Sequence, residues 1–202
     1  MKNPFYLIIL FTILSLLSCD FDHKKIVYEQ PDGFYRERYY INKVDSLKDG
    51  LYLKYFPNGT LWDSCTYKMG KLDGERKVFS TEGFMEVVEN YKDGVFDGDY
   101  KVFYPNGQLK LLQNIKDGMI QGFSYSYYQS GDIKEKVTMK DNEENGPFEE
   151  YYENGTIHWK GQYLGGDYEQ DSLYEYNDKG ELIKKMFCNA GVCETIWKSE
   201  NY

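Results

Sequence analysis

The sequence predicts an all-β protein, an elongated antiparallel β-hairpin meander of 24-residue repeats that forms a single, solenoid-like sheet. Three observations predict this fold. Glycines recur every 24 residues, turn dipeptides accompany them, and the segments between turns are short and β-prone. The repeat region has no convincing 3.6-residue apolar period, and its glycines would interrupt helices.

Three glycine columns are in phase. The first contains Gly50, Gly74, Gly98, Gly122 and Gly146, and the second contains Gly59, Gly83, Gly107, Gly131 and Gly155. The third contains Gly70, Gly94, Gly118, Asn142 and Gly166. Because asparagine tolerates positive φ better than most residues, the exception at Asn142 supports a turn at this column.

Each repeat is predicted to be one hairpin plus a turn onward to the next repeat. Pro105-Asn106-Gly107 is typical of a tight hairpin turn, and Leu109 to Ile115 is its return strand. Asp93-Gly94 marks the opposite turn, which Asp97-Gly98 is expected to close.

Three side-chain columns support this register. The first is aromatic throughout and contains Tyr55, Phe79, Phe103, Tyr127 and Tyr151. The second contains Leu61, Met85, Leu109, Ile133 and Ile157, and the third contains Tyr67, Tyr91, Ile115, Met139 and Tyr163. The second and third columns are six residues apart, an even separation, so we expect them to share one apolar face.

The aromatic column of Tyr55, Phe79, Phe103, Tyr127 and Tyr151 is also the candidate binding surface. Its first expected role is burial in the core. An open sheet, however, cannot easily cover a whole face, so strong curvature or a partner must cover it. The column would then accept an extended strand or a glycan.

The repeats divide the chain into five parts. We expect a signal peptide at 1–18, a lipidated tether at 19–27, an N-terminal partial repeat at 28–49, five repeats at 50–169, and a partial repeat with a C-terminal cap at 170–202. The last unit begins one residue out of phase.

The N-terminus predicts export and lipidation. Lys2 precedes an apolar run from Phe5 to Leu17, and its 13 residues are too few to span a bilayer but fit a secretory signal. The sequence that ends at Ser18-Cys19 resembles a bacterial lipobox. This resemblance implies cleavage before Cys19, a lipid anchor on it and a location in the bacterial cell envelope, with the choice of inner or outer membrane open. An ordinary signal peptide is the alternative.

The charge excludes one class of partner. The net charge is −9, and removal of Lys2 with the signal makes it −10. Nucleic-acid binding is driven by Lys and Arg, so we expect none, and an anionic lipid surface is disfavoured for the same reason. A basic partner suits this charge.

The columns resemble the bacterial variant of the MORN repeat, with the best copy from Gly98 to Leu109 followed by Asp117-Gly118. The resemblance covers roughly residues 28–185 and implies an elongated antiparallel meander. Many bacterial chains of this kind are labelled antitoxin-like, and eukaryotic relatives are linked to phosphoinositides and scaffolding. The family has no catalytic motif to transfer.

The remaining cysteines have different expected roles. Cys188 and Cys193 flank a plausible tight turn, and opposed hairpin residues are close enough for a disulfide. We predict a bridge that pins the C-terminal cap, with two reduced thiols or a metal pair as alternatives. The column of Cys65 is not reserved for thiols, so Cys65 is expected to be unpaired and inert.

No catalytic arrangement can be nominated around the two histidines, His23 and His158. The acidic turn at Asp93, Asp97 and Asp99 offers oxygen ligands for calcium, but its spacing departs from an EF-hand and turns favour Asp for their own hydrogen bonds. We therefore expect no enzyme activity, cofactor or metal.

The leading hypothesis is a membrane-anchored lipoprotein that binds or scaffolds a protein partner of unknown identity. The first alternative is an immunity or antitoxin-like protein that neutralises a toxin. The second is a glycan- or lipid-binding surface.

Overall fold

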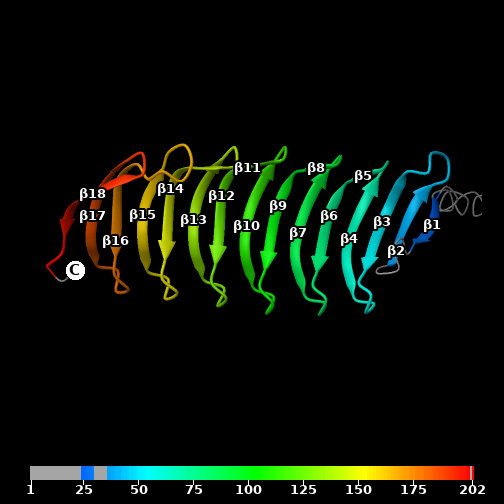
Figure 1. Cartoon of the computed structure of the whole chain (residues 1–202), viewed down its shortest axis with the longest axis horizontal. Helices are drawn as coiled ribbons and strands as arrows, with labels where there is room; N and C mark the ends of the chain where they lie inside the picture. The colour runs from blue at the N-terminus through cyan, green and yellow to red at the C-terminus, as the bar shows by residue number, and fades with distance from the viewer. Residues whose placement is uncertain (1–23, 30–35, 201) are drawn as a thin grey trace, which may run out of the picture.

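The computed structural model describes residues 24–29, 36–200 and 202, and this part of the chain forms 18 β-strands and no helix (Figure 1). The predicted all-β fold is confirmed. The signal peptide at 1–18 and the lipidation residue Cys19 lie outside the described residues. Within the described part, no helix is long and apolar enough to cross a membrane.

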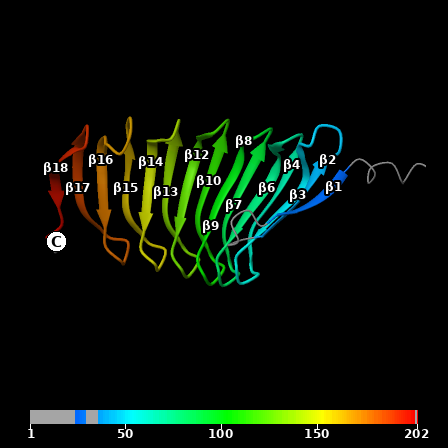
Figure 2. The same ribbon diagram turned by 45° about the vertical axis from the view of Figure 1, so that its right-hand side comes forward.

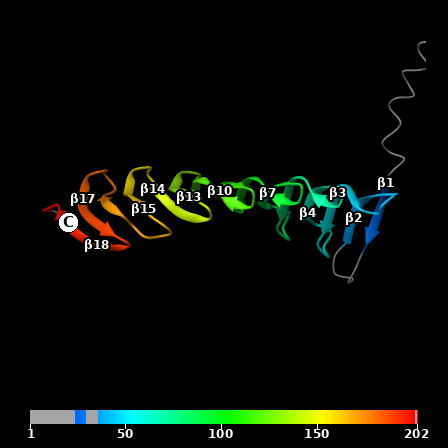
Figure 3. The ribbon, with the colours of Figure 1, turned by 90° about the horizontal axis from the view of Figure 1, so that it is seen from above.

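The strands follow one another along the long axis of the molecule. The long ones are β1 (Lys24–Glu29), β2 (Arg36–Asn42), β3 (Lys48–Tyr55), β4 (Leu61–Lys68), β6 (Gly74–Phe79), β7 (Met85–Lys92), β9 (Gly98–Phe103), β10 (Leu109–Lys116), β12 (Gly122–Tyr127), β13 (Ile133–Lys140), β14 (Glu143–Tyr151), β15 (Ile157–Tyr163), β16 (Asp171–Tyr176), β17 (Leu182–Asn189) and β18 (Val192–Lys198). The short ones are β5 (Lys71–Leu72), β8 (Val95–Phe96) and β11 (Met119–Ile120). The side and top views show a single layer of hairpins (Figures 2 and 3).

The two turns of each repeat use their glycines differently. At the first turn, the Gly59 amide donates to the Phe56 carbonyl at 2.9 Å, so Pro57 and Asn58 form the turn and Gly59 follows with φ of 88°. At the second turn, Asp93 and Gly94 both have positive φ, as a two-residue hairpin requires. The predicted positive φ at Asn142 is confirmed, at 73°.

The first glycine column does not close a turn, which corrects the expectation for Asp97-Gly98. Gly98 begins β9 and pairs with Ile115, and its φ is 127°. The Asp97 amide donates instead to the Asn90 carbonyl of the preceding return strand at 2.9 Å. The first glycine column therefore marks the residue at which the next long strand begins, shortly after the two-residue strand.

Hydrogen bonds join each repeat to the next along both edges of the sheet. At the first-turn edge, Asn106 Nδ2 donates to the Gln129 carbonyl at 3.1 Å, and the Tyr128 hydroxyl donates to the Tyr151 carbonyl at 2.6 Å. At the other edge, the Gly118 amide donates to the Phe96 carbonyl at 2.8 Å. Bonds of these three kinds recur between other neighbouring repeats.

A β-bulge on each return strand overturns the prediction that the second and third columns share a face. In the first repeat Tyr55 pairs with Leu61 and Lys54 pairs with Asp63, so Trp62 is the extra residue. Paired residues share a face, and successive residues of a strand alternate. Leu61 therefore lies with Tyr55 on one face, whereas Asp63, Cys65 and Tyr67 lie on the other. The same shift recurs in the later hairpins.

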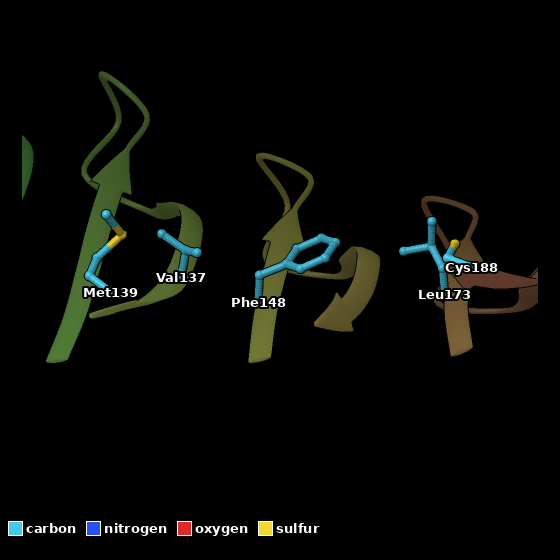
Figure 4. Close-up of a cluster of buried hydrophobic side chains, with 5 residues drawn as sticks. All are labelled: Val137, Met139, Phe148, Leu173 and Cys188. Carbon is cyan, nitrogen blue, oxygen red and sulfur yellow. The ribbon is translucent and has the colours of Figure 1, made fainter. Parts of the chain in front are cut away.

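We call the face of Tyr52, Asp63, Cys65 and Tyr67 the core face, and the face of Tyr55 and Leu61 the outer face. Of the ten buried hydrophobic residues in the described part, all but Val88 lie on the core face. Eight of the ten form two clusters, one around Tyr52 and Cys65 and one, drawn in Figure 4, around Phe148 and Leu173.

The ends of the body differ from the expected boundaries at two points. Lys24–Glu29 forms β1, paired antiparallel with β2, so the last residues of the expected tether at 19–27 belong to the sheet. At the other end, Tyr163 pairs with Glu169, whereas the equivalent Tyr91 pairs with Phe96. This longer turn holds the extra residue that puts the last hairpin one residue out of phase.

Candidate functional site

The predicted binding column lies on the outer face, close to the first-turn edge of the sheet. Tyr55, Phe79, Phe103, Tyr127 and Tyr151 are all half-buried. Tyr127 stacks on Tyr125 with ring centroids 6.5 Å apart, and the Tyr151 hydroxyl donates to Glu149 Oε2 at 2.7 Å. Burial and this carboxylate raise the pKa of Tyr151 to about 12. The column therefore leaves part of each ring open to solvent.

The core face carries a groove that the sequence did not predict. The groove has a volume of about 360 Å³ and is lined by Phe148, Glu150, Trp159, Tyr163, Glu169, Leu173, Met186, Gly191 and Cys193. These residues come from β14 to β18, from the turn that leads to β16 and from the turn between β17 and β18. The groove therefore spans the fifth repeat and the C-terminal hairpins.

Gly161 gives the floor of the groove its shape. It lies within β15 and pairs with Phe148, and a Cβ atom there would lie 2.9 Å from both Phe148 Cε1 and Leu173 Cδ1. Its missing side chain lets the Phe148 ring stack on Tyr163, with ring centroids 4.3 Å apart and planes at 18°. A glycine inside a strand often marks such a close approach.

Four glutamates give this part of the core face its charge. Glu144, Glu169, Glu135 and Glu150 are half-buried, and burial followed by these four charges raises the pKa of Tyr163. Burial, followed by the charge of Glu150, raises the pKa of Glu135. Burial, followed by the charge of Glu135, also raises the pKa of Glu144. The region therefore holds negative charge in a partly dry setting.

The N-terminal half of the same face holds its own cations. Arg76 lies between two carboxylates, with Nη2 at 2.7 Å from Asp63 Oδ2 and Nη1 at 2.8 Å from Glu89 Oε2. Lys48 Nζ lies over the rings of Tyr52 and Tyr67, 4.4 and 5.2 Å from their centroids. In this half, cations of the chain itself therefore contact its carboxylates and its aromatic rings.

The cysteines take separate places in the fold. Cys188 and Cys193 are joined by a disulfide, with Cα atoms 4.0 Å apart. They stand opposite each other where the earlier repeats place pairs such as Tyr91 and Phe96, so the bridge faces the core. Cys65 is buried and has no disulfide partner, and burial raises the pKa of its thiol to about 12.

The other candidates have local structural partners. His158 packs against Tyr152 with ring centroids 4.3 Å apart. Asp97 accepts a hydrogen bond from Lys116 Nζ at 2.8 Å, and Asp93 is one of the two turn residues with positive φ. Across the described residues, no three His, Cys, Asp or Glu side chains are grouped so as to hold a metal ion.

Sequence reasoning missed the groove because its residues belong to columns of mixed character. Phe148 shares its column with Arg76 and Ser124, and Gly161 shares its column with Glu89 and Val137. The one available signal was a glycine at position 161, outside the three glycine columns and inside a predicted strand.

The fold defines a β-hairpin repeat protein. The MORN repeat variant family matches residues 48–69, 96–117 and 144–164. These segments begin two 24-residue periods apart, in phase with the hairpins, so the chain carries MORN-type repeats. No curated protein matches the chain.

Proposed function

We propose that this chain is a lipid-anchored protein of the bacterial cell envelope, and that it binds a protein partner through its sheet without catalysing a reaction. The observation that carries the binding role is the single-layer sheet (Figure 3). The groove lined by residues of β14 to β18 and the outer aromatic column are both partly open to solvent. Aromatic residues are enriched at protein interfaces, where they supply contact area at low entropic cost.

The anchor rests on the apolar run before Cys19. We expect Cys19→Ser to lose labelling by radioactive palmitate. Diacyl and acyl chains together give stable anchoring. A Cys19→Ser protein that is labelled as strongly as the wild type would contradict the anchor.

Binding is tested in living cells with a photo-crosslinking amino acid. Met186→p-benzoylphenylalanine places it in the groove, and Phe123→p-benzoylphenylalanine places it on the outer face. The matched control is Glu153→p-benzoylphenylalanine, at an exposed turn. We expect one defined protein adduct from a face position and none from the control. Equal adduct patterns at all three positions would refute the binding role.

A toxin-neutralising role is the second candidate, and the net charge of −9 is the observation that favours it. Acidity suits a basic toxin, because complementary charge accelerates association. In that case the crosslinked partner is toxic when it is produced alone, and co-production of this chain restores growth. If the partner is harmless when it is produced alone, the toxin-neutralising role is wrong and the scaffolding role stands.

A further inference from the structure

The first repeat contains an aromatic site that is filled by a cation of the chain itself. Lys48 Nζ lies 4.6 Å from the ring centroid of Tyr39, 4.4 Å from that of Tyr52 and 5.2 Å from that of Tyr67. Cations are attracted to the faces of aromatic rings at these distances. The core face of this sheet can therefore bind an ammonium group against its aromatic columns.

The fifth repeat keeps two of the three rings, has Val137 in the place of Tyr39, and replaces the cation with an anion. Four periods along the chain, Phe148 stands where Tyr52 stands, Tyr163 stands where Tyr67 stands, and Glu144 replaces Lys48. Phe148 and Tyr163 line the groove together with Trp159. Two of the rings are thus repeated without a lysine at the position of Lys48.

The carboxylates around this second site lack the ion pairs found in the N-terminal half. Among the described residues, no lysine or arginine forms an ion pair with Glu135, Glu144, Glu150 or Glu169, whereas Arg76 forms ion pairs with both Asp63 and Glu89. Lys184, 5.5 Å from the Trp159 ring centroid at one end of the groove, is paired with Glu175 at 3.4 Å. Burial, followed by the charge of neighbouring carboxylates, raises the pKa values of Glu135 and Glu144.

We propose that the groove binds a lysine or arginine side chain from a basic, extended segment of a protein partner. The cationic group lies against Trp159 and Tyr163 and close to the carboxylates of Glu150 and Glu169, all of which line the groove. Charge complementarity selects this occupant, because a second copy of a chain with net charge −9 would bring more negative charge. The inference deepens the proposed function and rests on it.

The test uses the full chain in a neutral detergent and the peptide acetyl-Lys-Thr-Lys-Thr-Lys-amide, with binding measured by calorimetry. The matched peptide carries acetyl-lysine at each lysine position, which removes the charge and keeps the side-chain length. We expect the lysine peptide to bind saturably and the acetylated peptide to bind at least about tenfold more weakly. Increasing salt should weaken the binding of the lysine peptide.

The protein variants locate the binding. Glu150→Gln with Glu169→Gln removes two groove charges and should lower affinity about tenfold or more. Glu143→Gln with Glu153→Gln removes two exposed charges nearby and should leave affinity within about twofold. Circular dichroism melting curves establish that both double variants fold. Equal losses in the two double variants, or tight binding of the acetylated peptide, would overturn the proposal.

Other outcomes separate this inference from the proposed function. Binding of spermine or phosphatidylcholine vesicles without binding of the lysine peptide would overturn the basic segment as occupant. If the partner crosslinked in cells at position 186 is captured equally by the Glu150→Gln, Glu169→Gln protein, the inference fails and the proposed function stands. If no partner is captured at either face, the proposed function fails whatever the peptide does.

Discussion

Gly98 lies in close contact with a side chain of the preceding repeat. A Cβ atom there would lie 2.9 Å from Asn90 Cβ, and φ is 127°. Gly98→Ala should therefore lower the free energy of unfolding by about 2–3 kcal/mol, from backbone strain and from the clash. Urea unfolding followed by circular dichroism measures the change.

Gly118→Asn is the matched control for this substitution. Gly118 has φ of 80°, and within the described part of the chain a Cβ atom there would meet nothing within 4 Å beyond its two chain neighbours. Asn142 occupies the same column with φ of 73°. We expect a loss below about 1 kcal/mol. If both variants lost the same stability, the close approach at Gly98 would have no energetic role.

The contribution of Glu135 to stability falls as pH rises, whereas that of an acid in a salt bridge grows as pH rises. Burial and then Glu150 raise its folded pKa, so the folded state favours the protonated form. Its contribution to stability is full below the unfolded pKa and is lost as pH rises through the raised folded pKa. Glu135→Gln should stabilise the protein by up to about 1 kcal/mol at pH 7 and change little at pH 4.

Thermal melts of wild type and Glu135→Gln at pH 4 and pH 7 check this prediction, with Glu143→Gln as the exposed control. Stabilisation of equal size at both pH values would show that the effect of Glu135 is not its charge.

At the scale of elements, the tyrosines beside the first turns hold neighbouring hairpins together. The Tyr128 hydroxyl donates to the Tyr151 carbonyl at 2.6 Å, and Tyr104 and Tyr152 make the same bond to the next repeat. Tyr128→Phe should cost about 1 kcal/mol, since it leaves a carbonyl without its donor. Tyr168→Phe, at an exposed ring, should cost less than about 0.3 kcal/mol in the same urea titration.

The disulfide closes the last hairpin and should stabilise it locally. Replacing both Cys188 and Cys193 by alanine is expected to cost about 2 kcal/mol, from the entropy of a short closed loop. Hydrogen exchange should increase in β17 and β18 and stay unchanged in β3 to β9. Free thiols at both positions in non-reducing mass spectrometry would contradict the bridge itself.

The sequence predicted the elements better than it predicted the faces. Glycine and asparagine at the turns have direct conformational meaning, so the hairpins and the positive φ of Asn142 followed from the sequence alone. No residue type in the sequence indicates the bulge at Trp62, because the extra residue of a return strand cannot be told from a normally paired one by its type. One unpredicted residue per hairpin moved the Leu61 column to the outer face.

The groove required the register as well as the sequence. Phe148 and Gly161 are 13 positions apart and become partners only when β14 and β15 pair. The electrostatic environment of Phe148 and Gly161 depends on distances between residues of different repeats. A comparison of equivalent residues in the sequence does not give these distances.

On the scale of the whole molecule, the described strands pair with close neighbours in the chain, so the free energy of unfolding should be nearly a sum over repeats.

Deleting residues 98–121 removes one period and joins Asp97 to Gly122, which has the same place in its repeat as Gly98. The shortened chain should fold, and its urea m-value should fall by about an eighth, the share of the chain removed. Deleting 98–109 instead removes half a period and places the first turns of the later repeats at the edge that holds the second turns of the earlier repeats. The hydrogen bonds between repeats along both edges are then lost at the junction, so cooperative unfolding should be lost. Equal behaviour of the two deletions would mean that the 24-residue phase does not hold this sheet together.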